Sequence, residues 1–281
     1  MEQRADLHLH TNHSDGALSV EQLLRKALAR GLSTLSITDH DTVLGVDEAA
    51  EIGKSLGVEV VPGVELSATL GDHEVHILGY FVDQRDEEFK EYLTFFRQQR
   101  YHRAVRIVEK LNALSVPVRL DSVLEQAGKA AIGRPHIANA LVEAGLAESY
   151  YQAFDQYIGN GRPAYECKFS ITPRDTIDLI ARAGGIAVLA HPSVHTTESM
   201  LTQLVKDGLD GVEVIHPSHS PGVVTYYRGI AAEYFLLESG GSDFHGGRRD
   251  DDDAFGRFSV PVKFVEEMKR RLFDFRRRSV S

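Results

Sequence analysis

Residues 5–10 read Ala-Asp-Leu-His-Leu-His, and this stretch decides both the fold and the chemistry that the sequence predicts. Alternate side chains of an extended strand point to opposite faces, so His8 and His10 leave the same face. Two imidazoles at this separation can share one metal ion. A His-x-His pair also occurs as an ordinary polar pair at a strand end, so its interpretation depends on the rest of the chain.

Further ligand-type residues fall at or near the ends of other short apolar runs that are typical of strands. They are Asp15, His40, Glu65, His76, His191, Asp243 and His245. His40 follows a run over 32–38, and His191 follows one over 185–190. Imidazole and carboxylate ligands without thiolate are typical of hydrolytic Zn²⁺, Mn²⁺ or Fe²⁺ sites. The sequence therefore predicts a metal centre where several strands end.

The order of strands and helices divides the chain into three segments. The first 85 residues predict strands over 5–10, 32–38, 58–61, 64–67 and 74–81, with helices over 19–30 and 46–56. From residue 86 the pattern is mostly helical, over 87–114, 120–128 and 136–144. Strands return over 185–190, 211–215 and 235–238, after helices over 172–183, 197–207 and 222–233. We therefore predict a body formed by 1–85 and 172–281, with a helical insertion over 86–171.

The alternation of strands and helices predicts an α/β barrel. It implies parallel strands joined by crossover helices. About seven such strands fit a closed or nearly closed barrel better than an open sheet. In these barrels functional groups gather at the C-terminal ends of the strands, which is where the ligand-type residues fall. A last helix over 262–275 is expected to pack on the barrel or on a partner.

Composition restricts the classes of function. Of the 281 residues, 42% are hydrophobic, as in a globular protein, and no apolar run is long enough to cross a membrane. The single Cys167 excludes an internal disulfide, and with no apolar signal segment at the start a cytoplasmic location is the simplest interpretation. The net charge of −10 disfavours binding of duplex nucleic acid, but bound metals still allow a small anionic substrate.

In order, spacing and flanking residues, these groups resemble the polymerase and histidinol phosphatase (PHP) family of metal-dependent phosphoesterases. The motifs that carry the resemblance are His8-x-His10, Asp15-Gly16, Thr38-Asp39-His40-Asp41, Glu65, His191-Pro192 and Gly241-Ser242-Asp243-Phe244-His245. The resemblance implies a distorted seven-stranded (β/α) barrel that holds two to three divalent ions, Mn²⁺, Fe²⁺ or Zn²⁺. Some relatives have His in place of Asp15, and both side chains bind metals.

The resemblance also implies three ligand sets. They are His8, His10, Glu65 and Asp243 for one metal, Glu65, His76 and His191 for a second, and Asp15, His40 and His245 for a third. The positive charge of three divalent ions exceeds the negative charge of the three carboxylates by about three units. This net positive charge attracts a phosphate. We expect a hydroxide that bridges the two metals sharing Glu65 to attack phosphorus.

The insertion contains Gly133-Arg134-Pro135-His136. This segment resembles that of PHP members which dephosphorylate nucleoside monophosphates and 3′,5′-bisphosphonucleotides, some of which trim short RNA from its 5′ end. The planar fork of Arg134 matches phosphate oxygens, so Arg134 and His136 are candidates for substrate contact. The alternative is that Pro135 and His136 only open a helix, with Arg134 in solvent.

Three further histidines are candidates near the site. His13, in the loop after His10, is a candidate for substrate contact. His195, four residues past His191, is a candidate for substrate contact or catalysis. His216 ends a predicted strand, where it can orient a ligand or protonate a leaving oxygen. Solvent-facing positions are expected for His73, His102 and His219.

Four functions fit this pattern to different degrees. The insertion motif and Asp15 favour hydrolysis of nucleotide phosphate monoesters over histidinol-phosphate hydrolysis, the other free-standing activity of the family. Hydrolysis of C–N bonds is a further alternative, because amidohydrolases also begin with His-x-His on a first barrel strand. A non-catalytic metal-binding module is the fourth, and the complete set of nine ligands disfavours it. These residues indicate nothing about the oligomeric state.

Overall fold

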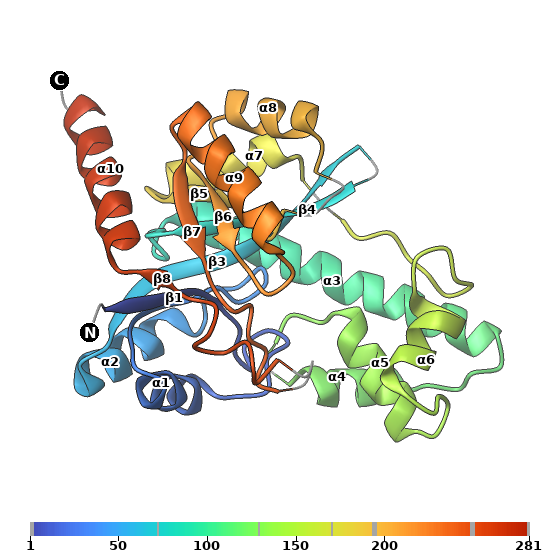
Figure 1. Ribbon diagram of the computed structural model, residues 1–281. Coiled ribbons are helices and arrows are strands. Elements are labelled where there is room, and N and C mark those ends of the chain that lie inside the picture. Colours follow the sequence, from blue (N-terminus) through green and yellow to red (C-terminus); the bar gives the residue numbers. More distant parts are fainter. Residues whose placement is uncertain are drawn as a thin grey trace.

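The computed structural model describes residues 3–279 except 72, 129, 170, 193–195 and 248–250, with the side chains of 275–279 also left out. Its described strands form one sheet in the order β7-β6-β5-β4-β3-β2-β1-β8 (Figure 1). The strands are β1 Arg4–Leu9, β2 Leu32–Ile37, β3 Glu59–Leu70, β4 His73–Tyr80, β5 Ile186–Leu189, β6 Gly211–Ile215, β7 Leu237–Gly240 and β8 Val260–Pro261.

The sheet curls into a nearly closed barrel, which confirms the predicted fold class. The backbone N–H of His10 donates to the carbonyl oxygen of Phe244 at 3.0 Å, just beyond β1 and β7. The backbone N–H of Ser242 also donates to the carboxylate of Asp6 at 3.0 Å. These bonds hold the segment after β7 against β1. The two-residue β8, which the sequence pattern does not predict, pairs antiparallel with β1 on the side away from β2.

One strand direction corrects the sequence-based prediction of parallel strands. β4 runs antiparallel to both β3 and β5. Only two residues, 71 and 72, separate β3 from β4, and so short a connection allows a hairpin but no crossover helix. The strands predicted over 58–61 and 64–67 are a single strand, β3. Gly63 lets β3 lie close to β2, because a Cβ there would lie 2.8 Å from the carbonyl oxygen of Ile37.

Helices cover the barrel and place apolar faces on it. They are α1 Val20–Ala29, α2 Val46–Leu56, α7 Pro173–Arg182, α8 Glu198–Lys206, α9 Pro221–Tyr234 and α10 Lys263–Ser279. α1 starts at a Ser19 cap and buries Leu23 and Leu24, which explains its position on the barrel. α10 buries Val265 and Met268 against the barrel core, so the last helix packs on its own chain. No helix in the described part of the chain has the length and apolarity that a bilayer crossing needs.

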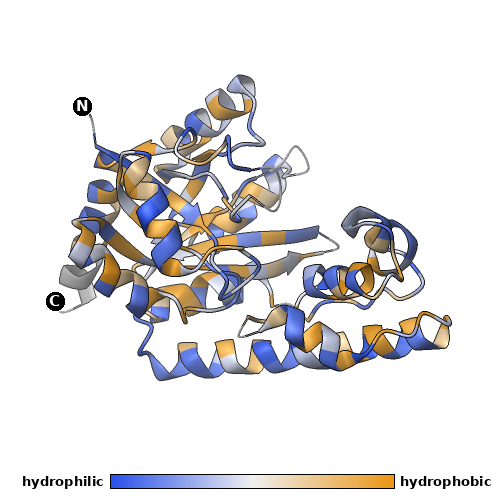
Figure 2. Ribbon diagram, turned by 90° about the horizontal axis from the view of Figure 1, so that it is seen from below, coloured by the Kyte–Doolittle hydropathy of each residue, from blue (hydrophilic) through white to orange (hydrophobic). Residues whose placement is uncertain are grey.

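The helical segment forms a lobe beside the barrel (Figures 1 and 2). It contains α3 Glu87–Ala113, α4 Leu120–Ala127, α5 Arg134–Glu143, α6 Tyr150–Ala153 and the π-helix η1 Phe154–Ile158. α3 joins the two parts, because Phe89 packs in a barrel cluster while Ile107 and Leu111 pack in the separate cluster of the lobe. The boundaries at 85/86 and 171/172 stay a prediction.

Candidate metal centre and substrate cavity

β1 places two buried histidines side by side at the barrel mouth. The ring centroids of His8 and His10 lie 5.2 Å apart, and both rings are inaccessible to solvent. Asp243, just after β7, brings a carboxylate oxygen to 3.0 Å from His10 Nε2 and 3.4 Å from His8 Nε2. The ligand atoms of these three residues are close enough to hold one metal ion.

Glu65 is the centre of the cluster. It is buried on β3, and its two carboxylate oxygens lie 2.8–3.4 Å from ring nitrogens of five histidines. These are His8, His10, His40, His76 and His191. Burial alone would raise the pKa of Glu65, but the surrounding imidazoles hold this pKa well below its usual range. Glu65 is therefore an anion that faces several possible metal positions at once.

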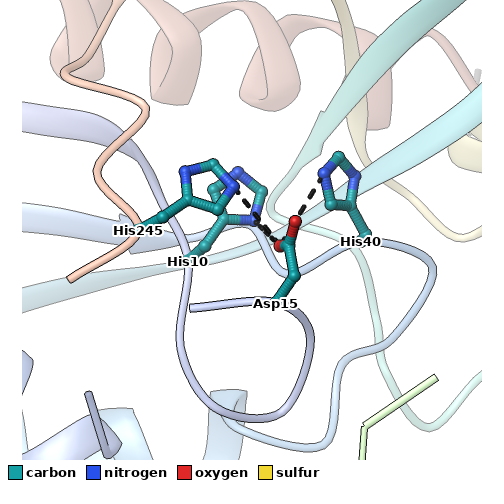
Figure 3. A group of neighbouring side chains, drawn as sticks. All are labelled: His10, Asp15, His40 and His245. Atoms are coloured by element: carbon teal, nitrogen blue, oxygen red, sulfur yellow. Dashed lines mark ion pairs between the residues drawn. The ribbon is translucent and has the colours of Figure 1, made fainter. Parts of the chain in front are cut away.

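A further group forms around Asp15 (Figure 3). Asp15 Oδ1 lies 3.3 Å from His245 Nε2 and 3.9 Å from both His40 Nε2 and His10 Nδ1. The ring of His10 stacks on that of His245 at 4.1 Å between centroids. His10 therefore presents one ring nitrogen to Asp15 and the other to Asp243.

The structure brings all nine predicted ligands together, in groupings that differ in detail from the sets the resemblance implies. His40, Glu65 and His76 form one group of neighbouring ligand atoms. His8, Glu65 and His191 form another. His76 and His191, which the resemblance puts on one metal, both face Glu65 Oε1, at 2.8 and 3.0 Å, and their ring centroids lie 5.2 Å apart.

The buried donor atoms fit divalent metal ions. His8 Nε2, both nitrogens of His10, His40 Nδ1 and Glu65 Oε2 are buried and make no hydrogen bond to any described residue. Leaving a buried polar atom unpaired costs about 1–3 kcal/mol, so a folded protein rarely keeps several together without a ligand. Imidazole and carboxylate lone pairs that converge in this way are the donor set of Zn²⁺, Mn²⁺ and Fe²⁺.

Glu213, which the sequence analysis did not single out, supports two of these histidines. It is buried on β6, with one oxygen 3.1 Å from His8 Nδ1. Its other oxygen accepts the backbone N–H of His191 at 2.6 Å. A carboxylate on one ring nitrogen directs the other nitrogen toward a metal. The sequence feature that could have identified Glu213 is its position between Val212 and Val214, because an acidic residue is unusual within an apolar, buried strand.

Asp39 and Asp41, the two acidic residues that flank His40, make different structural contacts. Asp39 accepts hydrogen bonds from the backbone N–H and the hydroxyl of Thr11, at 2.7 and 2.6 Å. It therefore shapes the loop that carries Asp15. Asp41 forms an ion pair with Arg100 of α3, which ties the barrel to the lobe.

A cavity of about 300 Å³ lies between the centre and the lobe. Asp15, His40 and His76 line one side of it. Arg134 and His136 line the lobe side. Arg134 is thus not a purely solvated residue, and its guanidinium packs 5.6 Å from the ring centroids of both Phe154 and Tyr165. His136 is buried, and its Nδ1 accepts the backbone N–H of Gly133 at 3.0 Å.

The remaining histidine predictions have mixed outcomes. His216 Nε2 lies 3.5 Å from Asp243, in a second cavity beside the centre. His13 lies 3.6 Å from Glu48 and lines another cavity, which His136 also lines. His195 lies outside the described residues.

The solvent-facing position predicted for His219 is wrong. It is 8% exposed, because both ring nitrogens bond to the carbonyl oxygens of Val214 and Pro192. His73 and His102 are exposed, as predicted.

Comparison with known proteins shows where the chain belongs. Residues 6–158 match the PHP domain family. The chain is also 36% identical to the 5′-3′ exoribonuclease Rnm of Escherichia coli K12, over 85% of this chain and 84% of the relative. This chain belongs to the PHP family.

Two further comparisons agree with the PHP assignment. A 3′,5′-nucleoside bisphosphate phosphatase of Chromobacterium violaceum is 33% identical, over 85% of this chain and 86% of that protein. A solved structure from Bifidobacterium adolescentis, assigned as a metal-dependent phosphoesterase, matches with a TM-score of 0.87 and 34% identity over 95% of each chain. This PHP protein is a hydrolase that acts on phosphoester bonds.

Proposed function

We propose that this PHP hydrolase removes phosphate from nucleotide-sized phosphate monoesters. The substrates would include nucleoside monophosphates, 3′,5′-bisphosphonucleotides and the ends of short 5′-phosphorylated single-stranded RNA. The observation that carries the proposal is the cavity in which His40 and His76 of the centre face Arg134 of the lobe. A phosphate ester with an organic group of nucleotide size matches a cavity of about 300 Å³.

The nine clustered residues would hold two to three divalent ions, Mn²⁺, Fe²⁺ or Zn²⁺. We assign His8, His10, Asp243 and Glu65 to one ion and Glu65, His76 and His191 to a second. Asp15, His40 and His245 would hold a third, with His10 close enough to contribute. Ions in such sites acidify a bound water and stabilise phosphoryl oxygens.

The protein's own side chains would bind the substrate and move the proton. Glu65 is catalytic in this proposal, because its two oxygens lie between the histidines of neighbouring groups. Arg134 and His136 would contact the substrate from the lobe. His216 is placed to protonate the leaving oxygen, because its Nε2 is buried beside Asp243 and makes no hydrogen bond to a described residue. His13 stays a candidate for contact with a longer substrate, and His195 for contact or catalysis.

Chemistry and charge support the nucleotide class. Tyr150 and Phe154 give the cavity aromatic walls, suited to a sugar or base, while Arg134 provides a cation. Two relatives named above act on an RNA end and on a nucleoside bisphosphate. The net charge of −10 argues against duplex nucleic acid and acidic membranes as partners. We propose the cytoplasm, where nucleotides turn over and a lone Cys167 stays reduced, as its compartment.

The test is phosphate release, with added Mn²⁺, from AMP, adenosine 3′,5′-bisphosphate, a short 5′-phosphorylated RNA and histidinol phosphate. We expect turnover of the nucleotides and a fall of about 10- to 100-fold in kcat/KM for Arg134→Gln. Exposed Arg162, from the same lobe, provides the control variant Arg162→Gln. Turnover of histidinol phosphate alone would overturn the nucleotide assignment.

A further inference from the structure

The segment after β7 carries two of the nine ligands, Asp243 and His245, and it fixes the orientation of the His245 ring. His245 is fully buried, and its two ring nitrogens have different neighbours. Nδ1 lies 2.7 Å from the carbonyl oxygen of Asp243, while Nε2 lies 3.3 Å from Asp15 Oδ1 (Figure 3). Because a carbonyl oxygen only accepts, Nδ1 carries a ring proton. Nε2 is therefore the nitrogen that can bind an ion beside Asp15.

This arrangement depends on an unusual backbone shape over 243–247. Asp243 has a φ of 49°, in the left-handed region that residues with a Cβ rarely adopt. Gly246 and Gly247 follow with φ of 83° and 85°, which glycine adopts at little cost. A Cβ at Gly246 would also lie 2.9 Å from the Cβ of Ala17. A left-handed residue at a ligand position persists only where the surrounding contacts fix it.

Asp251 provides contacts that fix this segment. Its two carboxylate oxygens accept the backbone N–H groups of His245 and Gly247, the second at 2.7 Å. Bonds from a backbone N–H to a carboxylate are shorter and stronger than bonds between neutral groups. The carbonyl oxygen of His245 accepts from the backbone N–H of Ala17 at 2.9 Å, so both backbone groups of this ligand are held.

Asp251 is not placed to bind an ion itself. Among the described residues, the groups of ligand atoms that are close enough to hold a metal contain Asp15, Asp243 and His245 but not Asp251. Both oxygens of Asp251 are also bonded to the backbone. Its effect on the centre therefore passes through the segment that it holds.

We propose that Asp251 is a positioning residue for the ion that Asp15, His40 and His245 would hold. The inference rests on the ligand assignment of the proposed function and adds a residue outside that set. By holding the backbone of the segment, Asp251 keeps the carbonyl oxygen of Asp243 on His245 Nδ1. Nε2 is then directed at the ion before the ion arrives, so binding requires less ordering of the ligand.

The other two ions should depend less on Asp251. Their proposed sets share Glu65 on β3 and include His8 on β1 and His76 on β4. Hydrogen bonds between the strands fix these positions, and only Asp243 of these sets comes from the segment after β7. The loss of Asp251 should therefore weaken the binding of one ion selectively.

The test is titration of the metal-free protein with Mn²⁺, with free Mn²⁺ followed by electron paramagnetic resonance. In Asp251→Asn the side chain keeps one acceptor oxygen and turns an NH₂ group toward the other backbone N–H. We expect one ion to bind about 10- to 100-fold more weakly than in the wild type, and the remaining ions to bind as before. Asp253→Asn is the matched control, because Asp253 is exposed and the change removes the same charge two residues away.

Three results of the titration would overturn the proposal. The first is that Asp251→Asn binds every ion as tightly as the wild type. The second is a loss of the same size in Asp253→Asn, or a loss spread equally over all ions. The third is a Mn²⁺ stoichiometry that Asp15→Ala leaves unchanged, because the ion that Asp251 is proposed to serve would then be absent.

A second measurement does not depend on how Asp251→Asn folds. In the Zn²⁺-loaded wild type, the ring nitrogen NMR shifts of His245, assigned with His245→Gln, should show Nδ1 protonated and Nε2 bound to the ion. Coordination through Nδ1 would overturn the proposal. Phosphate release by the wild type tests the proposed function separately. If the ions bind but none of the phosphate esters is hydrolysed, that function fails, and the titration still decides the role of Asp251.

Discussion

Glu213→Gln tests how the protein orients the first histidine of the centre. The wild-type carboxylate accepts from two sides, with oxygens 3.1 Å from His8 Nδ1 and 2.6 Å from the backbone nitrogen of His191. Glutamine has one oxygen and one NH₂ group in nearly the same volume. If the amide oxygen keeps the backbone bond, the NH₂ group meets His8 Nδ1. That nitrogen must then accept, so the ring proton moves to Nε2 and blocks the atom that faces Glu65 and Asp243.

The size of the effect follows from the loss of one orienting partner. Removing such a partner lowers metal affinity by about 10- to 100-fold, or about 1.4–2.8 kcal/mol. Titration of the metal-free protein with Mn²⁺, with free Mn²⁺ followed by electron paramagnetic resonance, measures both affinity and stoichiometry. Glu238→Gln is the matched control, because Glu238 on β7 forms an ion pair with the exposed Arg228 and not with a histidine of the centre.

If Glu213→Gln, with an unchanged melting temperature, binds Mn²⁺ as tightly as the wild type, Glu213 does not orient His8. His8 would then be held by its own rotamer and its packing on β1. A lower affinity in Glu238→Gln of the same size would also refute this role, because the loss would then follow from the change of charge and not from the bond to His8.

Three further predictions concern the centre, pH and packing. Glu65→Ala should lose at least two bound ions by elemental analysis, since its oxygens lie near five imidazoles; full metal content would contradict its bridging role. Burial raises the pKa of Asp210 above its ordinary value of 3.8, so the native state keeps that proton longer than the unfolded state. Stability from this group should therefore fall as pH rises above 3.8, and Asp210→Asn should gain stability relative to wild type over this rise, as measured by urea unfolding. Met268→Ala should cost about 2–5 kcal/mol in the same assay, because Met268 of α10 is fully buried against the barrel; a change near zero would mean that α10 is not docked.

Many of the ligands were predictable because they lie at or just beyond the end of a recognisable strand, although Glu65 and His76 lie within β3 and β4. His8 and His10 alternate on one strand, and Asp243 follows the last parallel one. Strand direction was not predictable from the same pattern, since apolar alternation over 74–81 is identical in both directions. Only the short connection at 71–72 indicates that β4 turns back.

The residues around the metal centre were harder to predict from the sequence than the metal ligands themselves. Arg97, Arg100, Arg103 and Arg106 recur every third residue along α3, a visible basic stripe. The sequence does not show which of them turn toward the cavity, because this depends on how the lobe docks through Asp41 and Lys168. The burial of His219 was missed for a similar reason, since one of its two backbone partners, the carbonyl oxygen of Pro192, is distant in the chain.

The closure of the barrel between β1 and the segment after β7 determines when the centre forms during folding. His8 and His10 lie far from Asp243 and His245 in the chain. The bond from His10 to Phe244 exists only once these two segments have met. Under the proposed ligand assignment, the two ions that take Asp243 and His245 therefore have complete ligand sets only in the closed barrel. Loading of these two ions follows closure, and the ions that the folded protein meets in its compartment are those it acquires.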